Sequence, residues 1–373
     1  MSRPILPALP APANSDILEK SAETMEWLQN NIAVGFTTER GPAWWANART
    51  KDGTWEMPEG SHFEGAVPID VVHRILDVRL VKGKVFVEYE DEEGNRQIAT
   101  DPDTMPIVNQ RTGKVFSYPS DGYTIHPYIQ TLAGFINAIT DSTAEVGSVG
   151  LLKRGGQAFL QAVLPEQYEV EGYGYVPYLL MVTSADMSRS TSGSTGIRGA
   201  VCDNTVNAAI TGAVSKFTKK HTRNSRLKVQ EAREQLGLRL VQVGEEMAET
   251  ITDLCKVDVS PAQFREWLDL CVPVKEKDGT AKTGRGLTMA ENKRERLITL
   301  TKDPKVAPWF GTAFGIVQLD NTDRTWNQTV KRAEGGRIER NFTNDANGIS
   351  AAADMTALDT LAKVLDRRLV LTA

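Results

Sequence analysis

The hydrophobic and polar positions of residues 197–233 predict a short strand followed by a basic amphipathic helix. Apolar residues recur there at steps of three or four, which is the spacing of one helix face. They are Val206, Ile210, Ala213 and Phe217. Cations at helical spacing, about a quarter turn away, are Lys216, Lys219, Lys220 and Arg223. Two interpretations stay open: a solvated basic face, or a track for a phosphate backbone.

Short apolar runs separated by turn signals predict strands before this helix. The predicted strands are 76–81, 84–90, 97–100, 105–109, 114–118, 144–152, 158–170 and 176–183, the last pairing with 197–202. Helices are predicted at 15–31, 69–75 and 127–138. The segment 184–196 is rich in Ser, Thr and Gly, and we expect it to be a flexible loop.

After residue 227 the pattern is helical. The predicted helices are 227–254, 261–271, 288–300, 307–317, 323–333 and 350–368. The expected fold class is α+β: an antiparallel or mixed β-sheet packed on a long basic helix, with a helical C-terminal extension. The expected organisation is a flexible Pro-rich arm at 1–14, an α+β core at 15–255 and a helical region at 256–373.

Composition narrows the classes of function. The chain has 373 residues, 40% of them hydrophobic, and a net charge of −5, which argues against coating nucleic acid with the whole surface. Three scattered cysteines suggest reduced thiols rather than a disulfide framework. With no long apolar run and no signal-peptide pattern, we expect a soluble, cytoplasmic protein that does not enter membranes.

Catalytic patterns are missing from the sequence. It shows no zinc-ligand spacing, no P-loop and no GxSxG nucleophile pattern. We therefore assign no catalytic residue, no metal and no cofactor, and expect a protein that is not an enzyme. The open alternative is an enzyme acting on nucleic acid, with carboxylates such as Asp186 and Asp203 holding a metal.

Candidate phosphate contacts gather in the basic stretch and in two turns. They are Lys153, Arg154, Arg189, Arg198, Lys216, Lys219, Lys220, Arg223 and Arg226. Trp44, Trp45 and Tyr123 are candidates for base stacking, with packing under a loop as the alternative.

Two segments resemble a known family. Val201 to Thr205, read VCDNT, and the later His221-Thr222 pair resemble the VCxNT…HT signature of a phage and plasmid family long described as a domain of unknown function. The resemblance covers about 41–237. More remotely, the layout resembles the ring-forming single-strand annealing recombinases, of the RecT, Redβ and Erf types and of the eukaryotic type.

The remote resemblance implies a function. It implies a phage-type protein that binds single-stranded DNA and anneals it to an annealed duplex without ATP, acting as a homo-oligomer, with a ring as one form, in the cytoplasm of a bacterial host. A host single-strand-binding protein or a phage exonuclease is a candidate partner. A phage protein–protein adaptor is a further alternative.

Overall fold

The structure is a computed structural model of the chain. It describes residues 32–36, 62–63, 66–140, 144–164, 167–199, 205–207, 216–223, 236, 238–276, 278–328, 340–341, 344, 349–367 and 369. The arm predicted at 1–14 and the helix predicted at 15–31 lie outside these residues, as do Trp44, Trp45 and Arg226.

One sheet organises the described part of the chain, and its strands run β13-β12-β11-β9-β8-β1-β2, with β10 beside β11 and β14 beside β12. The strands are β1 (Ile32–Phe36), β2 (His62–Phe63), β8 (Glu145–Leu152), β9 (Gln157–Val163), β10 (Tyr168–Val170), β11 (Tyr173–Ser184), β12 (Thr191–Gly199), β13 (Thr205–Asn207) and β14 (Lys216–Lys219). Only the β1–β2 pair is parallel among the described pairs.

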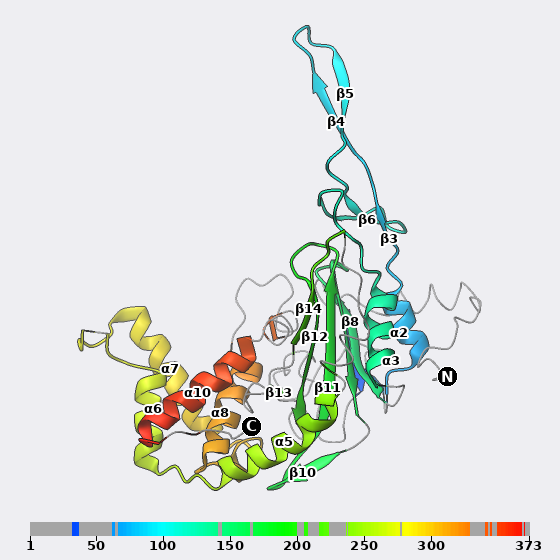
Figure 1. Cartoon of the computed structure of the whole chain (residues 1–373). Helices are drawn as coiled ribbons and strands as arrows, with labels where there is room; N and C mark the ends of the chain where they lie inside the picture. Colours follow the sequence, from blue (N-terminus) through cyan, green and yellow to red (C-terminus); the bar gives the residue numbers. More distant parts are fainter. Residues whose placement is uncertain are drawn as a thin grey trace.

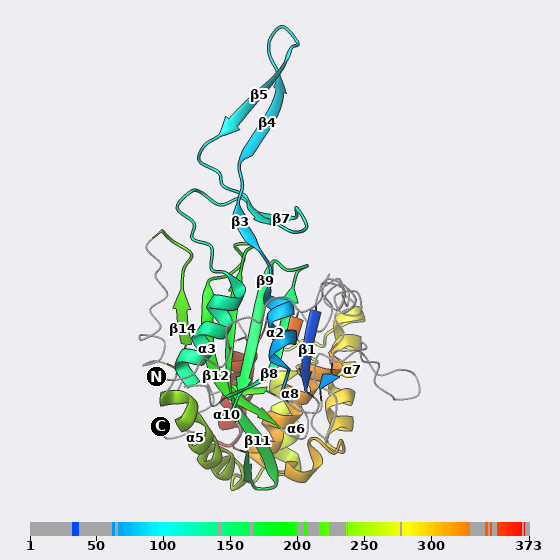
Figure 2. The same cartoon turned by 90° about the vertical axis from the view of Figure 1, so that its right-hand side faces the viewer.

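Both faces of the sheet are covered. Every residue of β9 is buried, which explains why this strand reads as a nearly continuous apolar run rather than an alternating one. Helices α2 (Ile69–Leu76), η1 (Ile129–Ala133) and α3 (Gly134–Thr140) lie on one face, and the C-terminal helices lie on the other side (Figures 1 and 2). Leu132, Phe135, Leu160 and Met181 share the core under the first group.

A protrusion leaves one end of the sheet. Its base is a small antiparallel sheet of β3 (Leu80–Lys82), β6 (Ile107–Asn109) and β7 (Val115–Ser117). Beyond it, β4 (Val85–Glu90) and β5 (Arg96–Asp101) form a hairpin that points away from the rest of the molecule (Figure 1). The hairpin turn predicted after residue 90 is confirmed, with Gly94 at a φ of 81°.

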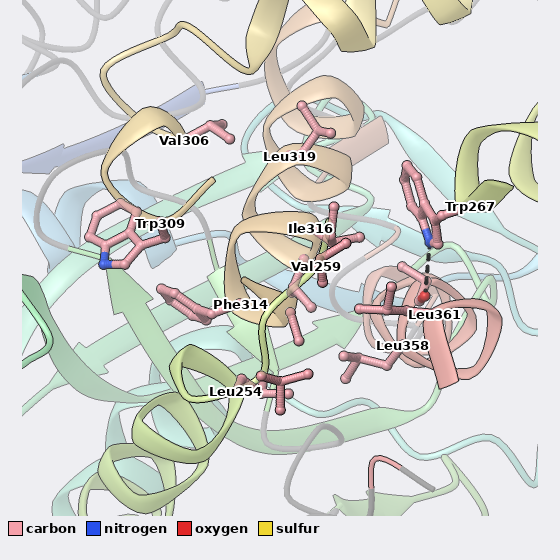
Figure 3. Close-up of a cluster of buried hydrophobic side chains, with 14 of the residues drawn as sticks. Leu254, Val259, Trp267, Val306, Trp309, Phe314, Ile316, Leu319, Leu358 and Leu361 are labelled. Carbon is pink, nitrogen blue, oxygen red and sulfur yellow. Dashed lines mark hydrogen bonds between the residues drawn. The ribbon is translucent and has the colours of Figure 1, made fainter. Parts of the chain in front are cut away.

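The C-terminal region is helical. Its elements are α5 (Leu238–Cys255), α6 (Pro261–Cys271), α7 (Gly284–Leu300), η4 (Ala307–Trp309), α8 (Ala313–Thr322), η5 (Asp323–Asn327) and α10 (Ile349–Val364). Ser260 and Gln263 form a reciprocal capping box at the start of α6, with Pro261 in its first turn. In Figure 3, fully buried Trp267 donates from Nε1 to the Ala357 oxygen at 3.1 Å, which ties α6 to α10.

These helices share a core with the sheet. Tyr173 and Ile197, from β11 and β12, are fully buried in the same cluster as Phe314 of α8. The Tyr173 ring meets those of Phe314 and Trp309 edge-on, at centroid distances of 5.2 and 5.4 Å. Aromatic contacts of this kind fix the helical region against the start of β11.

The expected α+β class, the antiparallel or mixed sheet and the C-terminal helical region are confirmed. The long basic helix is wrong wherever its residues are described, because Thr205–Asn207 and Lys216–Lys219 are strands that pair with β12. Phe217 is buried opposite Gly193, so sheet pairing outweighs the helical spacing of the apolar residues.

Two smaller predictions also change. The segment 184–196 is not a loop throughout, because β12 begins at Thr191. The single strand predicted at 158–170 is two strands, β9 and β10. In the part of the chain that the structure describes, no helix combines the length and apolar character that crossing a membrane requires.

Candidate nucleic-acid interface

Four segments meet at the end of the sheet from which the protrusion leaves (Figure 1). They are the β8–β9 turn, the β11–β12 loop, residues 120–126 and residues 219–223. Ala185 N donates to Gly156 O at 2.8 Å, and Thr124 N donates to His221 O at 3.3 Å. We call this surface the basic end. Its cations are Lys114, Lys153, Arg154, Arg189, Lys219, Lys220 and Arg223.

The β8–β9 turn holds two cations in an unfavourable backbone conformation. Lys153 and Arg154 have φ angles of 52° and 54°, and Gly155 N donates to Leu152 O at 3.1 Å. Positive φ at both central residues is the conformation for which Asn-Gly is preferred, because a Cβ costs about 1–2 kcal/mol there. The sequence keeps two long cations at a position where smaller residues would be more stable.

Lys114 supports this turn from β7's edge. Its Nζ donates to the Arg154 oxygen at 2.9 Å and lies 5.0 Å from the centre of the Phe116 ring. Burial lowers the pKa of Lys114, and the neighbouring Arg154 charge lowers it further. Cations are therefore crowded at this tip, and an anion would relieve their repulsion.

Asp186 is the carboxylate among these cations. It accepts hydrogen bonds from Ser188 N at 3.0 Å, from Ser188 Oγ, and from Gln157 Nε2 at 3.3 Å. Lys153 Nζ lies 3.8 Å from its Oδ2. Gly156 packs so closely that an added Cβ would lie 3.2 Å from the Asp186 Cβ. Asp186 thus holds the β11–β12 loop against the β8–β9 turn.

Arg189 lies half-buried in the same loop. Burial lowers its pKa, and the charge of Asp186 opposes that shift. Its Nε is buried and has no hydrogen-bond partner among the described residues. A buried donor without a partner costs about 1–3 kcal/mol, so it marks a place where a bound acceptor would be stabilising.

A stack of three rings stands beside the loop. Tyr123 and His221 are parallel at 4.9 Å, and His221 and His126 are stacked at 4.0 Å between centroids. Tyr123 donates from its hydroxyl to Ser184 O at 3.1 Å. His126 Nδ1 lies 2.7 Å from Thr191 Oγ1, which also contacts Thr183 Oγ1 at 2.8 Å.

The two histidines are held neutral. Burial, then His221 and Lys219, lower the pKa of His126 to about 4. Burial also lowers the pKa of His221, although its hydrogen bond to the Thr124 oxygen opposes this. Burial raises the pKa of Tyr123. At neutral pH the stack carries no charge of its own, and the surrounding Lys and Arg residues determine the local potential.

Several predicted residues come together here: Tyr123, Lys153, Arg154, Arg189, Lys219, Lys220 and Arg223. Lys220 is exposed, and Arg223 pairs with Asp121 at 2.7 Å. Lys216 begins β14, opposite Ser194. Arg198 is not gathered with them, because seven residues of strand separate it from Thr191, which is about 23 Å.

Sequence reasoning missed Lys114, His126, Gln157 and Ser188 at this site. His126 and His221 are 95 positions apart in the chain, and no spacing rule joins them. Asp186, considered as a metal ligand, instead pairs with Lys153 and Ser188, and Asp203 lies outside the described residues. Among the residues described, no group of three His, Cys, Asp or Glu side chains is placed to hold a metal ion.

One family model matches residues 115–343, and its description is a domain of unknown function (DUF932). That match covers more than half of the chain. The chain belongs to the DUF932 family. The match contains most of the basic end, from Val115 onward, and extends into the C-terminal helices, whereas the β4–β5 hairpin lies before it. No curated protein matches the chain, and no solved structure does.

Proposed function

We propose that this DUF932 protein binds single-stranded DNA and anneals complementary strands without ATP, as a homo-oligomer. The observation that carries the proposal is the basic end, where four cations surround Asp186 beside a stack of uncharged rings. The four are Lys114, Lys153, Arg154 and Arg189.

The charge arrangement suits a phosphate backbone. Lys153 and Arg154 lie at an exposed turn, and the buried Nε of Arg189 offers a donor without a described partner. Lysine and arginine gain affinity for DNA by releasing its condensed counterions, which makes binding fall steeply with salt. Ser188 and the backbone of the β11–β12 loop can supply additional donors to phosphate oxygens.

The ring stack suits single strands rather than duplex. Half-buried Tyr123 is held by its hydroxyl bond to Ser184 and by His221 on one face. A ring fixed in this way can extend its stack to an unpaired base, and such stacking tolerates any sequence. Annealing requires this combination, because phosphates must be neutralised while the base edges stay free to pair.

The test compares two variants with equal changes of net charge. Arg154→Glu/Lys220→Glu alters the basic end, and Lys275→Glu/Lys302→Glu alters exposed residues of the helical region. We expect the first to weaken binding of a labelled single-stranded oligonucleotide at least about tenfold and to slow ATP-free annealing of complementary strands, because two phosphate contacts are lost. Fluorescence anisotropy and a strand-pairing assay measure these effects.

The control variant should bind and anneal as the unaltered chain does. Equal losses in both variants would mean that only overall charge matters, and they would reject the basic end as the site. No binding by the unaltered chain at low salt would reject the proposed function.

A protein–protein adaptor is the second candidate, and the exposed apolar side chains of the β4–β5 hairpin favour it. An adaptor would be indifferent to oligonucleotides at every salt concentration. The binding assay above therefore separates the two candidates.

A further inference from the structure

The β4–β5 hairpin, residues 85–101, exposes apolar side chains on both of its faces. We call it the acidic hairpin. Phe86 and Ile98 are on one face, with 66% and 73% of their surface exposed, and Val87 and Tyr89 are exposed on the other. Neither face has a covering layer, and a two-stranded hairpin is only marginally stable in water. The hairpin therefore has the character of a contact surface.

The hairpin is nevertheless firmly specified. Asp91 organises its turn by accepting from Asn95 N at 2.8 Å and from Gln97 Nε2 at 2.9 Å. Glu88 and Arg96 pair across the strands at 3.4 Å. At its base, Gly83 N donates to Pro106 O at 2.7 Å. These contacts hold the apolar side chains in a defined projecting arrangement.

The charge of the hairpin is opposite to that of the basic end. Residues 85–101 contain six acidic residues and one basic residue, and the acidic ones concentrate at the tip. The hairpin points away from its own basic end (Figure 1), so the two surfaces meet only between molecules. Complementary charges on two separate surfaces of one chain favour a head-to-tail contact.

We propose that the acidic hairpin docks on the basic end of a second copy of this chain. The contact is heterologous, and its repetition builds a ring or a filament. Lys153, Arg154 and Lys220 face the carboxylates of Glu90, Glu92 and Glu93, and the exposed apolar side chains are covered by the neighbour. This inference rests on the homo-oligomer of the proposed function, and it names the surfaces that form it.

The same cations are then sought by two anions. The carboxylates of the hairpin and the phosphates of DNA compete for the basic end, so DNA displaces the hairpin of the neighbouring copy as it binds. Removing the acidic charge of the hairpin should therefore weaken assembly and strengthen DNA binding together. Damage to the fold would weaken both, which makes the opposite signs diagnostic.

The test uses the full-length chain with Glu90→Lys/Glu92→Lys/Glu93→Lys. These side chains are exposed, and the substitutions leave Asp91 and the Glu88–Arg96 pair in place. The matched control is Glu266→Lys/Glu291→Lys/Glu295→Lys, on exposed positions of α6 and α7. Light scattering at low salt gives the molar mass of each, and anisotropy gives its affinity for a short single-stranded oligonucleotide.

We expect the unaltered chain and the control to form a multiple of the single-chain mass, and the hairpin variant to have the mass of one chain. The hairpin variant should bind the oligonucleotide several times more tightly than the control. Arg154→Glu/Lys220→Glu should also be a single chain alone. Mixed with the hairpin variant, it should assemble again, because the reversed hairpin meets the reversed basic end.

A hairpin variant with the mass of the unaltered chain would overturn the inference, and so would an unaltered chain that stays single at every concentration. These outcomes are separable from failure of the proposed function. Assembly that depends on the hairpin, in a chain indifferent to DNA, would reject DNA binding and support the docking contact. DNA binding with assembly that ignores the hairpin would do the reverse.

Discussion

The two ends of the central sheet differ in what their residues satisfy. At the end where β11 begins, Tyr173 and Ile197 are fully buried against aromatic residues of the C-terminal helices, and α6 starts with a complete capping box. At the basic end, two cations have positive φ, and a buried arginine Nε has no described partner. The first end is built for stability, whereas the second keeps unfavourable features.

Unfavourable features persist in a fold when a function requires them. The turn at Lys153 and Arg154 would be more stable with Asn-Gly, and Arg189 would be better served by a nearby acceptor. Each becomes favourable when an anion binds. The difference between the two ends therefore separates residues that hold the fold from residues that act.

The largest expected effect is at the stable end. Trp267→Ala removes a fully buried ring and its hydrogen bond to the Ala357 oxygen. We expect the free energy of unfolding to fall by about 3–5 kcal/mol. Urea unfolding measures this, and the variant that remains folded at low temperature should still bind single-stranded DNA. Unchanged stability would mean that this end is not the stabilising one.

The next effect is a dependence on acid. Folding lowers the pKa of His126 to about 4, below the usual value near 6.5, so the unfolded chain binds more protons between these values. Stability is fully present above pH 6.5 and is lost as pH falls toward 4, by up to about 1.4 kcal/mol per pH unit for this group. His126→Gln should flatten the slope of unfolding free energy against pH. An identical slope in the variant would show that another group is responsible.

A smaller effect distinguishes charge from structure at the basic end. Asp186→Asn removes the carboxylate that pairs with Lys153 and holds Ser188. We expect stability to fall by about 1 kcal/mol as charge-assisted hydrogen bonds weaken. Affinity for single-stranded DNA should rise a few-fold, because an opposing charge is gone. A loss of affinity would indicate that Asp186 orders the binding loop more than it repels phosphate.

The smallest expected effect has the opposite sign. Lys153→Asn/Arg154→Gly places the preferred residues in the β8–β9 turn. Relief of the positive-φ strain should raise the free energy of unfolding by about 0.5–1 kcal/mol, less what the exposed ion pair to Asp186 contributed. A lower midpoint in urea would contradict the view that the two cations are kept at a cost.

Sequence patterns predicted much of the fold. The hairpins, α2 and the C-terminal helices follow from local signals, such as Pro68 before α2 and Ser260 before α6. The basic helix failed for a non-local reason. Phe217 fits a helical stripe and a strand equally well, and its pairing with Gly193 across β12 decides between them. Contacts with β12 are not visible in a local window.

The candidate site was predictable as a set of cations but not as an arrangement. Lys153, Arg154 and Arg189 stand in turn signals that sequence alone exposes. Their meeting depends on the register of β8, β9 and β11, and the ring stack depends on segments 95 residues apart. The positive φ of Lys153 and Arg154 carries no sequence signal, because the pattern there lacks the Asn or Gly typical of it.

The most direct test measures how affinity for single-stranded DNA depends on salt in the unaltered chain and in Lys153→Asn/Arg154→Gly. This variant keeps or improves the fold, so lost binding cannot be ascribed to unfolding. We predict weaker binding and a slope of log affinity against log salt that is shallower by about 1.4, which corresponds to two phosphate contacts on a single strand. An unchanged affinity and slope would contradict the assignment of the basic end as the DNA-binding surface.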